Sequence, residues 1–367
     1  MKIQCLNQNI KEAVLISERS SSKNQTLPIL NSLFLGVEKD KIKIRATNLE
    51  TAIEMQISGK INESGSVVIP AKTFGLFLSN LNDEQITLES QKNNLLVKTK
   101  TANTVIRGFA PEDFPIFPKI EPQEKLSLPV GELIDGISSV AISISPNDTK
   151  PELNSMFFKI FKNTLKMAAT DSFRLAEKII TSKNISLEKM VSFLVPQKSV
   201  LEILKIMSKE ENIEFGINKN HLVLRAPNIK FISRLIDGAF PDYEQIIPKN
   251  FKTTAIVNKA EIVSNLKVAG VFTGKLNDVS LNFNKDENKI YISSSSGDAG
   301  EHNANISAQI QGENITSKFN LRYIMDGVSQ INQEYISFNL NGADLPMLVK
   351  GKNDASYSYI VMPMRGI

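Results

Sequence analysis

The residues that most often perform catalysis or bind metal ions are few and far apart in this chain. It has one cysteine, Cys5, and two histidines, His221 and His302, among 367 residues. Metal sites built from histidine and cysteine need three or four such ligands close together. His221 opens a strand-like segment and His302 lies in sequence typical of a loop, which favours a surface position for both. We therefore expect no metal site and no catalytic histidine.

The segment from Gly270 to Leu276 is the nearest approach to a phosphate-binding loop. It has one spacer residue too few between its glycines and lacks the Ser or Thr that would bind magnesium. Because glycine is expected where a helix ends, we interpret it as a helix end followed by a turn. No nucleophile-elbow or zinc-protease motif occurs, and the acidic pair Glu112–Asp113 lies beside proline. We therefore predict a protein that is not an enzyme, with no catalytic residues and no cofactor.

The elements that position the side chains repeat along the chain. Six times, an apolar strand end leads into an amphipathic segment of about a dozen residues, at intervals of 63, 59, 67, 62 and 62 residues. A period this regular indicates one supersecondary unit used six times. The segments start near Asn7, Pro70, Pro129, Pro196, Asn258 and Asn320.

Short alternating segments between the predicted helices are typical of antiparallel strands. In the first third of the chain they are 32–40, 41–49, 51–61, 85–91, 94–100 and 103–109.

Two repeated units make about 120 residues, which is a usual size for a domain. Proline-rich segments at 111–125 and 240–252 mark the joints, because proline fixes the backbone and removes a hydrogen-bond donor. We therefore predict an α+β fold of three similar domains, each with two helices and two small antiparallel sheets. The predicted domains are 1–122, 123–247 and 248–367.

The predicted helices carry basic residues away from their apolar faces. In the fourth, Val200, Leu201, Leu204 and Met207 recur at helical spacing and predict a face that packs on a sheet. Such basic residues can simply be solvated. Their recurrence on five of the six helices instead favours a shared surface that attracts phosphates without reading bases. They are Lys11, Arg19, Lys72, Lys198, Lys205, Lys209, Lys259, Lys267 and Arg322.

The amino-acid composition indicates the cellular compartment and the classes of binding partner that this protein can have. A net charge of +4 is too small an excess to identify a nucleic-acid binder. A single cysteine excludes an internal disulfide and fits a reducing compartment. No apolar segment approaches the roughly 20 residues that span a bilayer, and the N-terminal segment has charges where a signal peptide is apolar. We expect a cytoplasmic protein without membrane contacts.

Several segments, in order along nearly the whole chain, resemble the bacterial sliding clamp family, the beta subunit of DNA polymerase III. The segment that contains FPDY and the segment that contains MPMR are specific in combination. The matching segments are TLPILNSLFLGV (26–37), RATNLETAI (45–53), VIPAKTF (68–74), APEDFP (110–115), MAATDSFRLA (167–176), FISRLIDGAFPDYEQIIPKN (231–250), FNLRYIMDGV (319–328) and YIVMPMRGI (359–367).

The resemblance implies a DNA clamp fold, in which two chains form a ring-shaped homodimer whose helices surround duplex DNA. Heterologous contacts that close under rotation form such rings. The implied DNA-facing residues are Lys11, Lys72, Lys198, Lys205, Lys259 and Arg322. In the implied interface, Ile106 of the first domain meets Val271 and Phe272 of the other subunit, and Lys72 pairs with Glu301.

The resemblance also implies a hydrophobic cleft between the second and third domains, where the replicative polymerase, the clamp loader and repair proteins insert linear peptides. This chain has Ser172–Phe173 where the family usually has Gly-His, and Glu244–Gln245 where basic residues are common. The first change predicts a bulkier, less polar cleft rim. The implied cleft residues are Leu153, Thr170, Arg174, Leu175, Pro241, Ile246, Asn320, Tyr323, Pro346, Val361, Met362, Pro363, Met364 and Arg365.

Two other functions are compatible with repeated sheets and basic helices. One is an enzyme that acts on nucleic acid, which would need a cluster of acidic metal ligands that the sequence does not present. The other is a DNA-binding scaffold that forms no ring. A mass measurement in solution distinguishes a ring from a monomer, because the ring has twice the mass of the chain.

Overall fold

The computed structural model describes residues 1–21, 27–185, 187–207 and 210–364. Each of the six predicted helices is present and begins within one residue of its predicted start. No helix in these ranges is long and apolar enough to cross a membrane. The helices are α1 (Asn7–Glu18), α2 (Ala71–Ser79), α3 (Val130–Ala141), α4 (Gln197–Ile206), α5 (Lys259–Ala269) and α6 (Leu321–Ser329).

The helices begin at defined residues because other segments of the chain bind their first N–H groups. These groups have no acceptor within the helix. Asn258 and Asn320 act as N-caps, since the Asn258 side chain accepts from the N–H of Glu261 and the Asn320 side chain accepts from the N–H groups of Arg322 and Tyr323. In five of the six helices, these two included, the first backbone N–H also donates to a carbonyl far away in the sequence. The pairs are Asn7 to Glu84, Val130 to Glu211, Gln197 to Asn154, Lys259 to Glu334 and Leu321 to Asn277.

The apolar face of α4 differs in part from the prediction. Val200 and Met207 are buried, but Leu201 is 42% exposed. A helix turns about 100° per residue, so Leu201 lies a quarter of a turn away from Val200. Ile203 and Ile206 are buried instead, because the buried face is centred near Ile203, and Leu201 lies about 160° around the helix from Ile203.

The chain divides into two compact units, and the first contains 1–131 and 201–235. Its two sheets are antiparallel and hold the first-domain strands close to their predicted positions. The five-stranded sheet has the order β5 (Lys60–Glu63), β1 (Lys2–Leu6), β7 (Gln85–Gln91), β8 (Asn94–Lys98), β9 (Asn103–Ile106). The eight-stranded sheet has the order β10 (Glu124–Pro129), β15 (Asn212–Ile217), β16 (His221–Ala226), β17 (Ile229–Arg234), β4 (Thr51–Ile57), β3 (Lys41–Thr47), β2 (Ser32–Glu38), β6 (Gly65–Pro70).

The second unit contains 132–200 and 236–367 and has the same plan. Its nine-stranded sheet has the order β14 (Leu187–Pro196), β11 (Ser155–Lys162), β12 (Thr164–Thr170), β13 (Arg174–Thr181), β26 (Tyr357–Val361), β25 (Met347–Gly351), β24 (Tyr335–Leu340), β18 (Thr253–Asn258), β22 (Gln309–Gly312). Its four-stranded sheet has the order β21 (Gly300–Ser307), β20 (Lys289–Ser296), β19 (Asp278–Asn284), β23 (Ile315–Asn320). Short 3₁₀ helices occur at η1 (Pro28–Asn31), η2 (Pro111–Asp113) and η3 (Gly270–Phe272).

The two larger sheets run across the predicted domain joints. Strand β17 pairs with β4, with Ile232 opposite Ala52, and β13 pairs with β26, with Leu175 opposite Ile360. The expectation of two separate small sheets in each domain is therefore wrong. These strands would otherwise be sheet edges, and pairing satisfies their backbone N–H and C=O groups. No local sequence pattern predicts which strands pair in this way.

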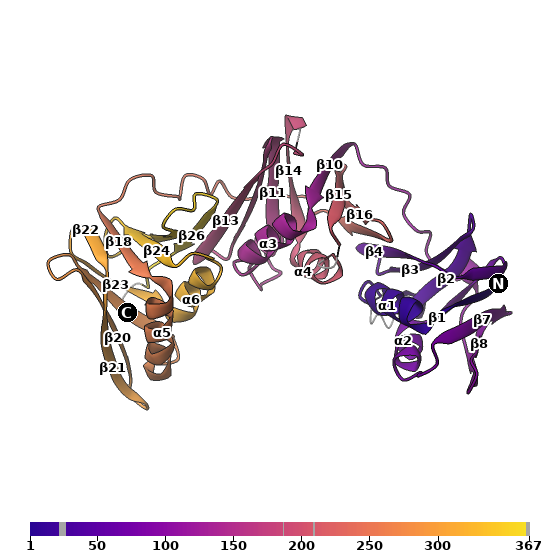
Figure 1. The fold of residues 1–367 in the computed structure, drawn as a ribbon. Helices are drawn as coiled ribbons and strands as arrows, with labels where there is room; N and C mark the ends of the chain where they lie inside the picture. Colours follow the sequence, from indigo (N-terminus) through magenta and orange to yellow (C-terminus); the bar gives the residue numbers. More distant parts are fainter. Residues whose placement is uncertain (22–26, 186, 208–209, 365–367) are drawn as a thin grey trace. The chain divides into compact units, whose positions relative to one another are not determined.

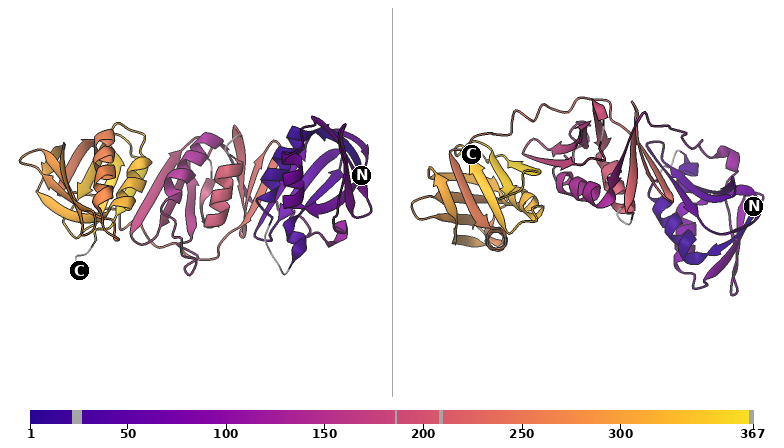
Figure 2. Two further views of the ribbon diagram at one scale, coloured as in Figure 1. Left: turned by 90° about the horizontal axis from the view of Figure 1, so that it is seen from below. Right: turned by 45° about the horizontal axis from the view of Figure 1, so that its top comes forward.

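Helices cover one face of each larger sheet. Helices α1 and α2 lie side by side in the first unit, and α5 and α6 do so in the second (Figures 1 and 2). Helix α6 approaches its sheet closely at Gly327, where an added Cβ atom would lie 2.0 Å from a ring carbon of Tyr359. The Tyr359 hydroxyl donates to the Tyr323 carbonyl at 2.8 Å. A glycine is required at this point because the aromatic ring fills the space of a side chain.

Candidate functional site

The structure brings most of the predicted cleft residues together around β13 and β26, within the second unit. Thr170 lies opposite Leu175 across the turn between β12 and β13, and its hydroxyl donates to the Arg174 carbonyl at 2.7 Å. Arg174 lies opposite Val361. Since side chains alternate along a strand, Leu175 with Ile360 and Arg174 with Val361 occupy opposite faces of the sheet.

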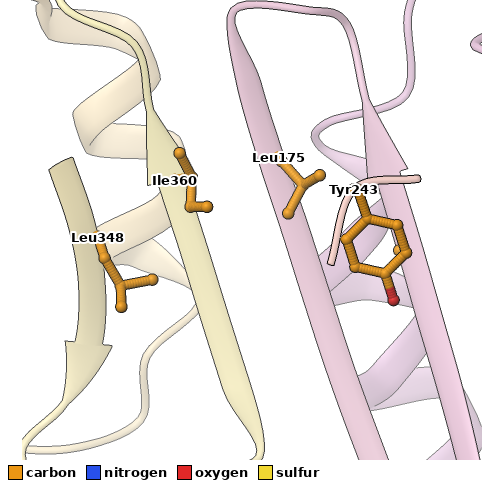
Figure 3. Packing of buried hydrophobic residues seen from close by; sticks show 5 residues of the cluster. Leu175, Tyr243, Leu348 and Ile360 are labelled. Carbon is orange, nitrogen blue, oxygen red and sulfur yellow. The ribbon is translucent and has the colours of Figure 1, made fainter. Parts of the chain in front are cut away.

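An apolar cluster forms on the Leu175 face of this sheet. Leu175, Tyr243, Leu348 and Ile360 pack together with Ala168, and each is at most 4% exposed. Figure 3 shows the Leu175 and Ile360 side chains on neighbouring strands, with the Tyr243 ring beside Leu175. We call this group the outer-face cluster. It gives the segment 240–251 a buried contact on the sheet.

Segment 240–251 crosses the outer-face cluster and carries two predicted cleft residues, Pro241 and Ile246. The Phe240 ring stacks on Phe157 with centroids 5.0 Å apart. The buried Tyr243 hydroxyl donates to the Glu177 carboxylate at 2.7 Å. Burial and the neighbouring Glu177 raise the pKa of Tyr243 well above its usual range, so the hydroxyl remains a neutral donor.

Glu244 adds an ion-pair anchor to the same segment. Its carboxylate accepts from the ammonium groups of Lys166 at 3.1 Å and Lys159 at 3.2 Å. The hydrogen bond from Lys166, followed by that from Lys159, lowers the pKa of Glu244. The acidic residue that departs from the family pattern is therefore complementary to two lysines on β11 and β12.

Arg174 joins β13 to α6 on the other face of the sheet. Its guanidinium donates to Asp171 at 2.9 Å and to Asp326, and lies 4.5 Å from the centroid of the Tyr323 ring. Burial alone would lower the pKa of Arg174, but Tyr359, Asp326 and Asp171 outweigh burial and raise it. Arg174 therefore acts as a fixed cation that orients the exposed edge of Tyr323.

Exposed apolar side chains flank these anchors. Phe173 is 61% exposed and Ile246 is 49% exposed. The Phe173 carbonyl accepts from the N–H of Met362 at 2.9 Å, so the turn and the last strand are joined. Ser172 has φ of 77°, which is the left-handed region that favours glycine. The turn thus keeps a backbone shape suited to glycine while it carries serine, and it presents a large aromatic side chain.

The predicted cleft residues differ in how much of their side chain is exposed. Exposed side chains could touch a peptide, whereas buried ones support the sheet beneath it. Val361 has no exposed surface, so its side chain packs under the site, and its assignment to the cleft stays a prediction. Leu153 is 8% exposed in the turn before β11. Pro346, Met362, Pro363 and Met364 keep intermediate exposure, and the N–H of Met364 donates to the Lys318 carbonyl. The predicted residue Arg365 lies outside the described residues.

Ile360 is a site residue that the sequence reasoning did not select. It is buried in the outer-face cluster, whereas the exposed Phe173 was expected at the rim of the cleft from its place in the motif. The pairing of Leu175 with Ile360 rather than Val361 depends on the register between β13 and β26. A strand register of this kind cannot be deduced from either segment alone.

All six predicted DNA-facing residues keep some surface open to solvent. Lys72, Lys198, Lys205 and Arg322 are exposed and Lys11 is partly exposed. Lys259 differs, because its ammonium donates to the carbonyl oxygens of Ile331 at 2.5 Å and Ser329 at 3.4 Å. A cation at the end of α6 complements the unpaired carbonyl groups there, so Lys259 has a structural role in its own unit. The basic residue Lys209 lies outside the described residues.

Two of the predicted interface residues lie in edge strands, Ile106 in β9 and Glu301 in β21. Strand β9 is an edge of the five-stranded sheet and β21 is an edge of the four-stranded sheet. Ile106 is only 5% exposed, while its neighbour Val105 is 58% exposed. Strand alternation directs Ile106 into its own domain, so Val105 offers more exposed apolar surface at this edge, and the assignment of Ile106 to the interface stays a prediction.

The third-domain part of the predicted interface is open. Val271 is 67% exposed and Glu301 is exposed. The Phe272 ring stacks on His302 at 5.7 Å. His302 lies in strand β21 rather than in the loop that its sequence indicated. Stacking on an aromatic ring explains how a polar residue fits this strand.

Comparison with known families identifies the chain. Models of the N-terminal, central and C-terminal domains of the DNA polymerase III beta subunit match residues 1–118, 127–242 and 244–365. The chain belongs to this family. Its members are the sliding clamps, which are processivity factors of DNA replication.

Individual sliding clamps match the chain over nearly its full length. The beta sliding clamp of Synechocystis sp. is 25% identical over 391 residues, which cover 100% of this chain and 99% of the relative. That of Staphylococcus epidermidis is 26% identical over 358 residues, which cover 95% and 94%. The crystal structure of the Bacillus subtilis sliding clamp superposes with a TM-score of 0.96 at 26% identity and covers both chains completely.

Metal-ligating side chains are not clustered in the described part of the chain. No group of three or more His, Cys, Asp or Glu side chains could hold a metal ion there. Cys5 is buried, and burial raises the pKa of its thiol to about 12. The thiol therefore stays protonated and unreactive near neutral pH.

Proposed function

We propose that this chain works without catalysis, as a processivity clamp of DNA replication: two copies close into a ring around duplex DNA and tether the polymerase through linear peptides. Membership of the sliding clamp family is the observation that carries this proposal. Topology then prevents dissociation, while weak phosphate contacts permit sliding. The domain boundaries at 122/123 and 247/248 belong to the same proposal, and both fall in segments without a helix or strand.

The DNA-facing residues in this proposal are the exposed cations of the helices. Lys198 and Lys205 are both exposed on α4, and phosphate contacts carry no direct sequence information. In a loader-driven assay, the ring should remain on closed circular duplex and slide off linear duplex. Reversal of both lysines to glutamate should weaken loading without changing sequence preference. Equal retention on linear and circular DNA would contradict the topological mechanism.

The subunit contact in this proposal joins β9 of one copy to β21 of the other. Both strands have free backbone groups at a sheet edge, and Val105 and Val271 supply exposed apolar surface. Light scattering in solution should give twice the chain mass. Val271→Asp should shift the protein toward monomer, because a carboxylate would have to lose its hydration in an apolar contact. A mass in solution equal to that of a single chain would refute the ring.

The peptide site in this proposal lies around segment 240–251, β13 and the last strand. Ile246, Phe173 and Pro241 offer exposed apolar surface beside a buried support. Methionine is adaptable, so Met362 and Met364 suit a site that accepts different partners. Polymerase, clamp loader and repair proteins would each present a short apolar motif there.

A labelled peptide of the Gln-x-x-Leu-Phe type tests this site. Ile246→Ser should weaken its binding about tenfold or more, since truncating one apolar anchor of an interface typically costs about 1.4 kcal/mol or more. Met190→Ser is a matched control, because Met190 is 61% exposed on β14 in the same unit. Phe173→His should alter the preference among peptides more than stability. Unchanged affinity in both Ile246→Ser and Phe173→Ser would refute the assignment.

A further inference from the structure

A cavity in the first unit takes no part in the functions above. It has a volume of about 570 Å³, with residues 111–119 on one side and strands β2, β3, β4 and β17 on the other. Ile42 and Ile44 of β3 are buried beneath α1, so the alternating residues Lys43 and Arg45 lie on the opposite face. The cavity therefore opens on the face of the eight-stranded sheet that α1 does not cover.

Arg45 forms the floor of this cavity and is fully engaged. Its two terminal nitrogens donate to the Glu38 carboxylate, each at 2.6 Å, and its Nε donates to Glu54 at 2.6 Å. The guanidinium lies between the rings of Phe34 and Phe117, 5.5 and 5.2 Å from their centroids. Arg45 is therefore a rigid structural cation rather than a free binding group.

The remaining charges of the cavity do not balance. Lys43 lies 3.2 Å from Glu54 and 3.6 Å from Glu38, so two carboxylates are matched by Lys43 and Arg45. Three further lysines line the cavity, which leaves an excess of three positive charges. They are Lys39, Lys119 and Lys230.

Lys230 is the cation best placed to bind a ligand. Its ammonium lies 5.9 Å from the centroid of the Phe117 ring, and no carboxylate in the described part of the chain is within ion-pairing distance of it. Burial, and then the nearby charge of Arg225, lowers the pKa of Lys230. A bound anion would reverse this loss, because an opposite charge favours the protonated ammonium.

The cavity that Lys230 lines is also lined by an exposed apolar side chain, that of Ile116. Ile116 is 92% exposed, although it lies between Pro115 and Phe117 in the segment that lines the cavity. The neighbouring Phe114 is buried, and Phe117 packs on the sheet against Ala52 and Ile232. The segment is thus anchored on both sides of a side chain that projects into solvent.

We propose that this cavity binds an acidic linear peptide of a partner protein, with a carboxylate on Lys230 and an apolar side chain against Ile116 and Phe117. The volume is within the usual range for ligand sites and has room for a few residues. Charge complementarity selects an acidic partner. The lining favours a peptide over nucleic acid, because a peptide can match one cation at Lys230 and one apolar side chain at Ile116, whereas successive phosphates would need a row of free cations.

Selection from a phage-displayed library of random seven-residue peptides tests this proposal. The library is selected on the wild-type protein and depleted on Lys230→Gln, which removes peptides that bind elsewhere, including the site around segment 240–251. The surviving peptides should combine Asp or Glu with an apolar residue. They should bind Lys230→Gln and Ile116→Ser at least tenfold more weakly than wild type, and high salt should weaken binding.

Lys60→Gln is the matched control, since it removes the same charge from an exposed strand of the same unit that lies outside this cavity. It should leave binding unchanged. Binding of single-stranded oligothymidylate that is lost in Lys230→Gln would overturn the choice of a peptide. Failure of the selection to yield any peptide that separates wild type from Lys230→Gln would overturn the site itself. Neither result would affect the proposed clamp function, which the loading assay tests independently.

Discussion

Removal of the Tyr243 hydroxyl should release segment 240–251 from the sheet. In Tyr243→Phe, the buried Glu177 carboxylate loses a donor that lies at 2.7 Å. A hydrogen bond to a charged group contributes about 1.5–3 kcal/mol, and an unsatisfied buried acceptor adds its desolvation cost. We expect the local opening free energy of this segment to fall by about 2 kcal/mol. That change corresponds to roughly thirtyfold faster exchange where the opening equilibrium sets the exchange rate.

Hydrogen exchange is the suitable assay, because a chain with several domains does not unfold in one step while exchange reports local opening. Amides in peptides covering 240–251 should exchange faster in Tyr243→Phe, including the N–H of Ile246 that donates to the Tyr243 carbonyl. Tyr291→Phe is the matched control, since its exposed hydroxyl also donates to a carboxylate, that of Glu287. It should leave exchange unchanged. Wild-type exchange in Tyr243→Phe would refute the role of the buried hydrogen bond.

Three other outcomes follow from the packing and the charges. Gly327→Ala should destabilise the second unit by about 2 kcal/mol in thermal unfolding, because the added Cβ would lie 2.0 Å from the Tyr359 ring and overpack the core. Gly270→Ala is the control, since its added Cβ would make only ordinary contacts from 3.5 Å, and it should change thermal unfolding much less. The pKa of Glu244 is lowered by its lysine partners, so its contribution to stability is present above the unfolded pKa, near 4.5, and is lost as pH falls through the lower folded value. Comparison of wild type with Glu244→Gln across pH 7 to 3 should show this difference in stability shrink, and a difference that is as large at pH 3 as at pH 7 would contradict it. Burial raises the pKa of Cys5 to about 12, so a thiol reagent at neutral pH should label it only after unfolding; rapid labelling of the native protein would show that the thiol is accessible.

Features that depend on neighbouring residues in the chain could be predicted from the sequence. The six helix starts follow from apolar periodicity and from residues such as Asn258 and Asn320, whose side chains cap the helix that they precede. The strands of the first domain follow from short alternation between turn residues. The regular spacing of these local signals also indicates repetition of one unit, and the motif segments indicate the family.

Features that depend on which segments meet were decided by the tertiary structure. The sequence does not reveal that β4 pairs with β17 or that β13 pairs with β26, because pairing joins residues far apart in the chain. A register one residue different would exchange the faces of Ile360 and Val361. The same dependence on register and packing buries Ile106, exposes Val105, and gives Glu244 two lysine partners that no local pattern connects to it.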